Sequence, residues 1–198
     1  MNQFPTSFPP QHQNQQPGIE SQMNPKPSSI RDSYQPSGKL ETKVALISGG
    51  DSGIGRAVAL AFSREGADIV ITYLNEHDDA AETQKRVEES GRRCLVVAGD
   101  VGNEPFCRQL IDQIIKECGR LDVLINNAAE QHVQQNLENI SAEQLEKTFR
   151  TNIFSYFFLT KAALPHLKNG SSIVNTASVT AYHGDEQLID YSATKGAV

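Results

Sequence analysis

The chain has 198 residues, of which 38% are hydrophobic and 21% charged, and its formal net charge is −6. This length can hold one domain with a sizeable core, and the acidic balance argues against nucleic acid or an anionic membrane as a partner. The three cysteines (Cys94, Cys107 and Cys118) are an odd number without C-x-x-C spacing, which indicates neither a disulfide framework nor a zinc site. We therefore expect a cytoplasmic globular protein with reduced thiols.

Residues 1–38 differ in composition from the remainder of the chain. They are rich in Gln, Asn, Ser and Pro, show no amphipathic period and contain too few apolar residues to offset the entropy of ordering. We expect no secretory signal, because the segment has neither an apolar core nor a basic start, and no membrane span, because the chain has no apolar run long enough to cross a membrane. We predict a flexible extension, laid over the surface in places, ahead of a domain at residues 39–198. A solvated arm is the favoured interpretation, and a binding role is the alternative.

A strand, a glycine-rich turn and a helix are predicted in succession from residue 43. An unbroken apolar run at 44–47 is typical of a strand buried on both faces, and apolar residues resume at 57–62 with helical spacing. Between them, Gly49, Gly53 and Gly55 give the pattern G-x-x-x-G-x-G. Backbone N–H groups at such a helix start can bind an anion such as a diphosphate. A tight connection that binds nothing is the alternative.

The remainder of the chain alternates between strand and helix patterns. A helix at 141–167 is expected to begin with a capping box formed by Ser141 and Gln144, and a loop is expected at 179–190. Strands separated by helices imply a doubly wound parallel α/β sheet of the Rossmann type, with ligands at the carboxyl ends of its strands. The other predicted strands are 68–73, 94–98, 123–126 and 172–176, and the other predicted helices are 78–90 and 104–118.

Polar residues collect where these strands end. Asp100 follows the third predicted strand, Asn126 and Asn127 close the fourth, and Ser178 lies just beyond the fifth. Each could simply cap a loop, but together with the glycine turn they indicate one crevice at one edge of the sheet.

Tyr191 and Lys195 are four residues apart, so a helix would place them on the same face. A phenol with its ordinary pKa of about 10 is a poor acid or base at neutral pH unless a cation stabilises the phenolate, and Lys195 can supply that charge. A serine hydroxyl such as Ser178 could donate a hydrogen bond to a carbonyl substrate. Surface packing of the lysine on the tyrosine is the alternative. No metal site is expected, because His132, His166 and His183 lack ligand spacing.

Five separated motifs together resemble the short-chain dehydrogenase/reductase family in order and approximate spacing. Within it the chain is most similar to the bacterial general-stress-protein 39-like oxidoreductases, and the resemblance covers residues 39–198. Two departures are small: Ser48 stands where threonine is usual, and Ala129 where glycine is common. The motifs are Ser48-Gly-Gly-Asp-Ser-Gly-Ile-Gly55, Asp100-Val101, Asn126-Asn-Ala-Ala129 with Asn152, Ser178, and Tyr191-x-x-x-Lys195.

The resemblance implies a nicotinamide cofactor and a set of catalytic roles. Tyr191 would act as the acid/base and Ser178 would polarise the substrate carbonyl. Lys195 would bind the nicotinamide ribose and lower the tyrosine pKa, and Asn152 would hold a water that links Lys195 to solvent. The implied cofactor-binding residues are Gly49, Ser52, Gly53, Ile54, Gly55, Tyr73, Leu74, Asp100, Val101, Asn126, Ala128, Tyr191 and Lys195.

The choice between NAD and NADP depends on the residues after the second strand. An acidic residue there suits the free ribose of NAD, and a basic one suits the NADP phosphate. The sequence has Glu76 nearby and no Lys or Arg at the strand end, which favours NAD slightly; Arg56 is the residue that could reverse this.

We thus expect an oxidoreductase that transfers a hydride between a nicotinamide cofactor and a small alcohol or carbonyl substrate. The alternative is a catalytically silent dinucleotide-binding regulator, which would have no need of intact Asn152, Ser178, Tyr191 and Lys195. The chain ends three residues after Lys195, so the sheet is expected to be incomplete, with Ile173 and Val174 on an unprotected edge. We expect this fragment to be poorly stable and inactive alone, and its full-length parent to be a homotetramer.

Overall fold

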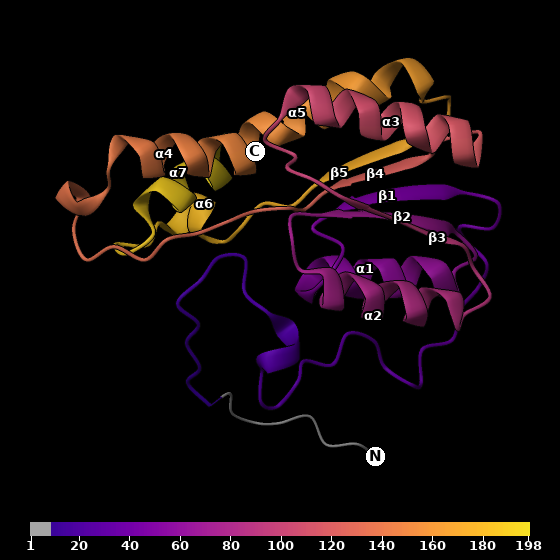
Figure 1. The fold of residues 1–198 in the computed structure, drawn as a ribbon, viewed down its shortest axis with the longest axis horizontal. Helices are drawn as coiled ribbons and strands as arrows, with labels where there is room; N and C mark the ends of the chain where they lie inside the picture. The colour runs from indigo at the N-terminus through magenta and orange to yellow at the C-terminus, as the bar shows by residue number, and fades with distance from the viewer. Residues whose placement is uncertain (1–8) are drawn as a thin grey trace.

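The structure is a computed structural model that describes residues 9–198, and it contains a single five-stranded parallel sheet (Figure 1). The strand order is β3-β2-β1-β4-β5, and every pairing is parallel. The predicted doubly wound α/β fold is confirmed. The strands are β1 (Val44–Ser48), β2 (Asp68–Tyr73), β3 (Cys94–Ala98), β4 (Val123–Asn126) and β5 (Ser172–Asn175).

Helices cover both faces of the sheet. In Figure 1, α1 and α2 lie on one face and α3 and α5 on the other. Strand β1 is buried throughout because its side chains alternate between two cores: Ala45 and Ile47 pack towards α1 and α2, and Leu46 packs towards α3 and α5. The helices are α1 (Gly53–Arg64), α2 (His77–Glu88), α3 (Glu104–Cys118) and α5 (Ser155–Ala163).

The long helix predicted at 141–167 is one helical run with a wider turn in its middle. It starts at Ser141 as predicted, and the Ser141 hydroxyl accepts a hydrogen bond of 3.1 Å from the main-chain N–H of Gln144. The predicted capping box is only half formed, because the Gln144 side chain bonds Gln134 and Asp190 instead. A π-helical segment then interrupts the helix and carries Asn152, and such segments are frequent at functional sites. The run consists of α4 (Ala142–Phe149), η3 (Arg150–Phe154), α5 and the 3₁₀ turn η4 (Leu164–His166).

The segment after β5 folds beside α4 rather than against the sheet (Figure 1). Helix α6 (Thr180–His183) occupies part of 179–190, so the prediction that all of this stretch is loop is wrong; helix α7 (Ile189–Ala197) carries Tyr191 and Lys195. Strand β5 is an edge strand, and its Ile173 and Val174 are 37% and 48% exposed, as predicted.

The N-terminal arm, defined here as residues 9–38, follows the surface of the domain in an extended path with one 3₁₀ turn, η1 (Glu20–Gln22). The solvated-arm interpretation does not hold around Glu20, because this side chain is only 6% exposed and contacts α1. The predicted flexibility of residues 1–8 lies outside the described residues. Within residues 9–198, none of the helices combines the length and the apolar character that a membrane span requires.

Candidate active site

The turn between β1 and α1 presents main-chain groups to a cleft. Gly49 and Gly53 have φ values of +63° and +51°, a region that side chains disfavour, and a Cβ added at Gly53 would meet no atom within 4 Å. The first turn of α1 is therefore open at Gly53, and the adjacent Ile54 is 66% exposed. The turn thus places a helix N-terminus beside the cleft, which suits an anionic group of a ligand, although the N–H of Gly53 itself already donates to Glu20 Oε2 (2.6 Å).

Gly55 has a different role from its neighbours. A Cβ at this position would lie 1.8 Å from the carbonyl oxygen of Gly49, so the absence of a side chain allows α1 to pack against the turn. The turn is also held from the other side, because Asn127 Nδ2 donates hydrogen bonds to the carbonyls of Ser48 (3.1 Å) and Gly49 (3.2 Å). Asn127 was predicted as one of the polar residues at the strand ends, but it was not among the predicted cofactor-binding residues.

Two residues stabilise the sheet beneath the cleft. The Ser48 hydroxyl accepts hydrogen bonds from the N–H groups of Asn127 (3.0 Å) and Ala128 (3.1 Å), which a threonine hydroxyl could equally do. Asn126 is fully buried, and its Nδ2 donates to Asn175 Oδ1 (2.8 Å) and to Thr160 Oγ1 (3.2 Å). Asn126 therefore ties β4 to β5 and α5, and it does not line the cleft.

The cleft itself has a volume of about 350 Å³ and lies at the carboxyl ends of β1 to β4. Its size is in the range of small-molecule sites. The structure brings together most of the predicted cofactor-binding residues on its walls, and Asp100 in addition accepts a hydrogen bond of 2.7 Å from the N–H of Gly102. The predicted residues that line the cleft are Gly49, Ser52, Gly53, Ile54, Tyr73, Leu74, Asp100, Val101 and Ala128.

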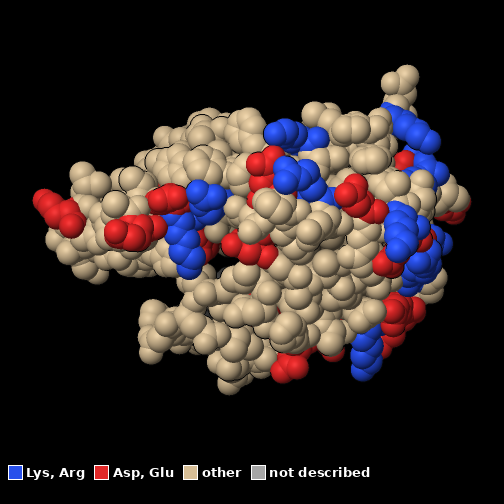
Figure 2. Space-filling model, turned by 45° about the horizontal axis from the view of Figure 1, so that its top comes forward, with Lys and Arg blue, Asp and Glu red and all other residues tan. Residues whose placement is uncertain are grey.

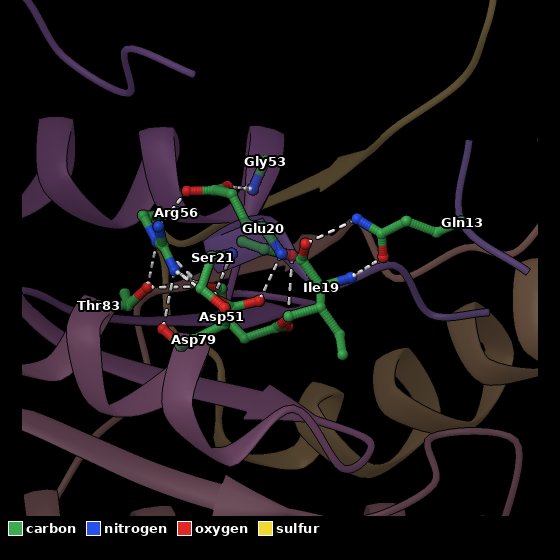
Figure 3. A network of polar contacts seen from close by, with 10 residues as sticks. Gln13, Ile19, Glu20, Ser21, Asp51, Gly53, Arg56, Asp79 and Thr83 are labelled. Atoms are coloured by element: carbon green, nitrogen blue, oxygen red, sulfur yellow. Dashed lines mark hydrogen bonds and ion pairs between the residues drawn. The ribbon is translucent and has the colours of Figure 1, made fainter. Parts of the chain in front are cut away.

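The part of the cleft near the end of β2 is acidic. Asp51 and Glu76 both line it, and burial raises the pKa of the Asp51 carboxyl. Arg56, which the sequence offered as a partner for a ligand phosphate, is 4% exposed and is not among the residues that line the cleft. Its guanidinium contacts Glu20, Asp79 and Thr83 instead (Figure 3).

The Tyr191 and Lys195 side chains lie together on α7, as predicted. Lys195 Nζ is 5.7 Å from the centre of the Tyr191 ring, and the lysine is only 2% exposed, so the pair is not a surface contact. Burial lowers the pKa of Lys195 to about 8. The ammonium group donates hydrogen bonds to the carbonyl of Thr176 (2.7 Å) and to the hydroxyl of Tyr156 (3.3 Å).

Tyr156 is a second phenol next to Lys195 that the sequence analysis missed. Its hydroxyl donates to the Thr176 carbonyl at 3.2 Å, and burial, followed by the charge of Tyr191, raises its pKa. Lys195 Nζ is 5.5 Å from the centre of the Tyr156 ring. The spacing of four residues from Asn152 on the same helical run could have indicated that both face α7.

Asn152 and Ser178 are placed differently relative to this pair. Asn152 is fully buried: its Oδ1 accepts from the N–H of Glu130 (2.8 Å), and its Nδ2 donates to the Glu130 carbonyl (2.9 Å) and to Thr194 Oγ1 (3.0 Å). It thereby holds α7 one residue before Lys195. The Ser178 hydroxyl accepts hydrogen bonds from the N–H and the hydroxyl of Thr180. Within residues 9–198, no hydrogen bond joins Ser178 to Tyr191.

Comparison with known proteins agrees with this geometry. The model of the short chain dehydrogenase family matches residues 43–198. The chain is 63% identical over 189 residues to the uncharacterized oxidoreductase YhdF of Bacillus subtilis, covering 96% of this chain and 65% of that protein. It is 54% identical over 198 residues to General stress protein 39 of the same organism, covering 100% of this chain and 69% of that protein.

Solved structures agree as well. A short chain dehydrogenase from Burkholderia cenocepacia in complex with NADP superposes with a TM-score of 0.77 at 31% identity, over 80% of this chain and 65% of that one. NAD⁺-bound xylitol dehydrogenase superposes with a TM-score of 0.76 at 27% identity, over 80% of this chain and 62% of that one. The chain spans about two thirds of the length of the relatives it matches. The resemblance predicted from the motifs is confirmed: the chain belongs to the short-chain dehydrogenase family of oxidoreductases.

Proposed function

We propose that the full-length protein is an NAD(P)-dependent oxidoreductase that interconverts an alcohol and a carbonyl compound. The observation that carries this proposal is the buried Lys195 beside Tyr191, on a helix that packs against the long helix bordering the dinucleotide cleft. A binding protein without chemistry would have no use for a lysine held in the interior next to a phenol, because burying the charge costs free energy. The alternative, a catalytically silent regulator, lacks such a supporting observation.

The roles of the side chains follow from their contacts. A bound nicotinamide dinucleotide would supply or accept the hydride. Tyr191 passes a proton to or from the substrate oxygen, and the Lys195 ammonium lies over its ring, 5.7 Å from the ring centre. Ser178, near the end of β5, donates a hydrogen bond to the substrate oxygen as charge develops there. Asn152 orients α7 through Thr194, and the water relay through Asn152 remains part of the proposal.

The acidic character of the cleft near β2 supports NAD over NADP. A 2′-phosphate placed beside the carboxylates of Asp51 and Glu76 would be repelled, whereas a ribose hydroxyl could donate a hydrogen bond to either. Relatives alone do not decide the matter. The NADPH-dependent aldehyde reductase 1 of Arabidopsis thaliana is 50% identical to this chain, and another neighbour is bound to NAD⁺.

We propose a homotetramer for the full-length protein, with a small-molecule substrate as its ligand. The long helical run exposes Phe154 (38%), Phe157 (72%) and Leu164 (57%), apolar surface that a second copy could cover. Nucleic acid is not part of the proposal, because acidic and basic side chains are interspersed on the face drawn in Figure 2. A cytoplasmic location is proposed from the free cysteines, since Cys94 and Cys107 are buried thiols.

The test is to follow NAD(P)H absorbance in the full-length protein with a panel of aldehydes, aldoses and polyols. The panel includes glucose and ribitol, because a glucose and ribitol dehydrogenase of Daucus carota is 46% identical. Tyr191→Phe should lower kcat at least about 100-fold, the size of a general acid–base contribution. Tyr182→Phe is the matched control, since Tyr182 is 95% exposed. Equal rates for wild type and Tyr191→Phe would refute the mechanism, and dinucleotide binding without turnover of any substrate would favour the silent regulator.

A further inference from the structure

One segment of the N-terminal arm is fixed against the turn between β1 and α1 (Figure 3). The side chain of Gln13 closes a small ring with Ile19, because its Nε2 donates to the Ile19 carbonyl (2.8 Å) and its Oε1 accepts from the Ile19 N–H (2.7 Å). Within this ring, Pro17 forms part of the cleft wall. The arm therefore contributes directly to the surface that a dinucleotide would meet.

Glu20 inserts its carboxylate between the arm and α1. Its Oε2 accepts a hydrogen bond of 2.6 Å from the N–H of Gly53, the first residue of α1 and a wall residue of the cleft, and its Oε1 pairs with Arg56. The backbone around it is held by α2, because Asp79 accepts hydrogen bonds from the N–H groups of Glu20 (2.7 Å) and Ser21 (3.2 Å). At 6% exposure the carboxylate is fixed directly behind the wall of the cleft.

In this arrangement each of the three guanidinium nitrogens of Arg56 donates to a neighbouring residue of the chain. Its Nε donates to Thr83 Oγ1 (2.8 Å) and its Nη2 to the carbonyls of Asp51 (2.7 Å) and Asp79 (2.9 Å), while Nη1 pairs with Glu20. The network thus combines one guanidinium with the carboxylates of Glu20 and Asp79, and the Asp51 carboxylate lies next to it on the cleft side. The surroundings of this turn carry excess negative charge.

We propose that Glu20 is a specificity-determining residue that makes the cleft discriminate against a dinucleotide with a 2′-phosphate. The inference rests on the proposed function only in requiring that the cleft binds a nicotinamide dinucleotide. Glu20 acts in two ways: it holds Arg56 away from the cleft, and it adds a negative charge behind Gly53. NADH and NADPH share the diphosphate, so the repulsion between Glu20 and the diphosphate cancels in the ratio of their affinities. The repulsion between Glu20 and the 2′-phosphate, which only NADPH carries, does not cancel and lowers the affinity for NADPH.

The experiment measures the dissociation constants of NADH and NADPH by the fluorescence of the bound reduced nicotinamide in the full-length protein. Glu20→Gln removes the charge and keeps the shape, and we expect the ratio Kd(NADPH)/Kd(NADH) to fall roughly fivefold. Glu20→Asp keeps the charge and should keep the ratio within about twofold of wild type. Glu82→Gln makes the same charge change at an exposed position on α2 and should leave the ratio unchanged.

Thermal unfolding checks that each variant is folded. If Glu20→Gln does not fold, Asp79→Asn, which removes the other carboxylate paired with Arg56, should lower the same ratio. An unchanged ratio in a folded Glu20→Gln protein, or an equal fall in Glu82→Gln, would overturn the inference and leave the proposed function intact. Failure of the wild-type protein to bind either dinucleotide would overturn both.

Discussion

Replacing Gly55 by alanine tests whether this glycine serves packing rather than ligand access. The new Cβ would lie 1.8 Å from the Gly49 carbonyl oxygen and 3.0 Å from Asn127 Nδ2. Because real Cβ contacts essentially never fall below 3.0 Å, α1 and the turn must separate by at least about 1.2 Å. That movement strains the two hydrogen bonds from Asn127 to the turn. Overpacking and the lost hydrogen bonds together should lower the free energy of unfolding by about 3 kcal/mol.

Gly53→Ala is the matched comparison, because it adds the same methyl group two residues earlier. No atom lies within 4 Å of its Cβ, so the only cost to stability is the φ of +51°, about 1–2 kcal/mol. Urea unfolding of the full-length variants, followed by circular dichroism, gives both values. Dinucleotide affinity should weaken in both variants and therefore does not separate them. The reasoning is refuted if Gly53→Ala destabilises the protein as much as Gly55→Ala, or if Gly55→Ala leaves stability unchanged.

Two buried or bonded ionisable groups predict how stability depends on pH. Lys195 has a pKa lowered by burial from 10.5 to about 8, so between these values the unfolded chain binds more protons and the free energy of unfolding should rise with pH. Urea unfolding at pH about 8 and about 10 measures this rise in the free energy of unfolding, and Lys195→Met should abolish it. A rise that persists in the variant would show that it does not come from the buried Lys195. The pKa of Glu65 is lowered from 4.5 to about 2, first by the hydrogen bond from Tyr34 and then by the N–H of Lys39. The contribution of Glu65 to stability is therefore present above pH 4.5 and lost as the pH falls towards 2. The Tm of Glu65→Gln should fall less than the Tm of the wild type when the pH is lowered through this window. A fall equal to that of the wild type would show that the contact between Glu65 and the arm does not stabilise the fold.

Much of the fold and part of the site could be predicted from local patterns. The apolar run of β1 had to be a strand buried on both faces, because an interior strand of a parallel sheet meets helices on either side. The glycines of the turn and the four-residue spacing of Tyr191 and Lys195 are equally local, since backbone conformation and helix periodicity act over a few residues. Such features can be predicted from the sequence without knowledge of any distant contact.

Other predictions failed or were incomplete because they depend on long-range contacts. The π-helical turn at Asn152 depends on how the long helical run packs against Glu130 and α7, which no periodicity encodes. Tyr156 reaches Lys195 from a helix 39 residues earlier, and a sequence pattern does not specify which polar groups meet across that separation. The burial of Lys195, and hence its lowered pKa, was decided by this packing.

The sequence by itself determined that a glycine turn opens onto a helix and that a tyrosine and a lysine share a helical face. Only the tertiary structure decided what surrounds them. Arg56 looked available for a phosphate in the sequence, but Glu20, which lies 36 residues earlier in a segment of low hydrophobicity, holds it away from the cleft. The physical reason is that propensity and periodicity are local properties, whereas a buried ion pair forms only where the folded chain brings two distant charges out of water together.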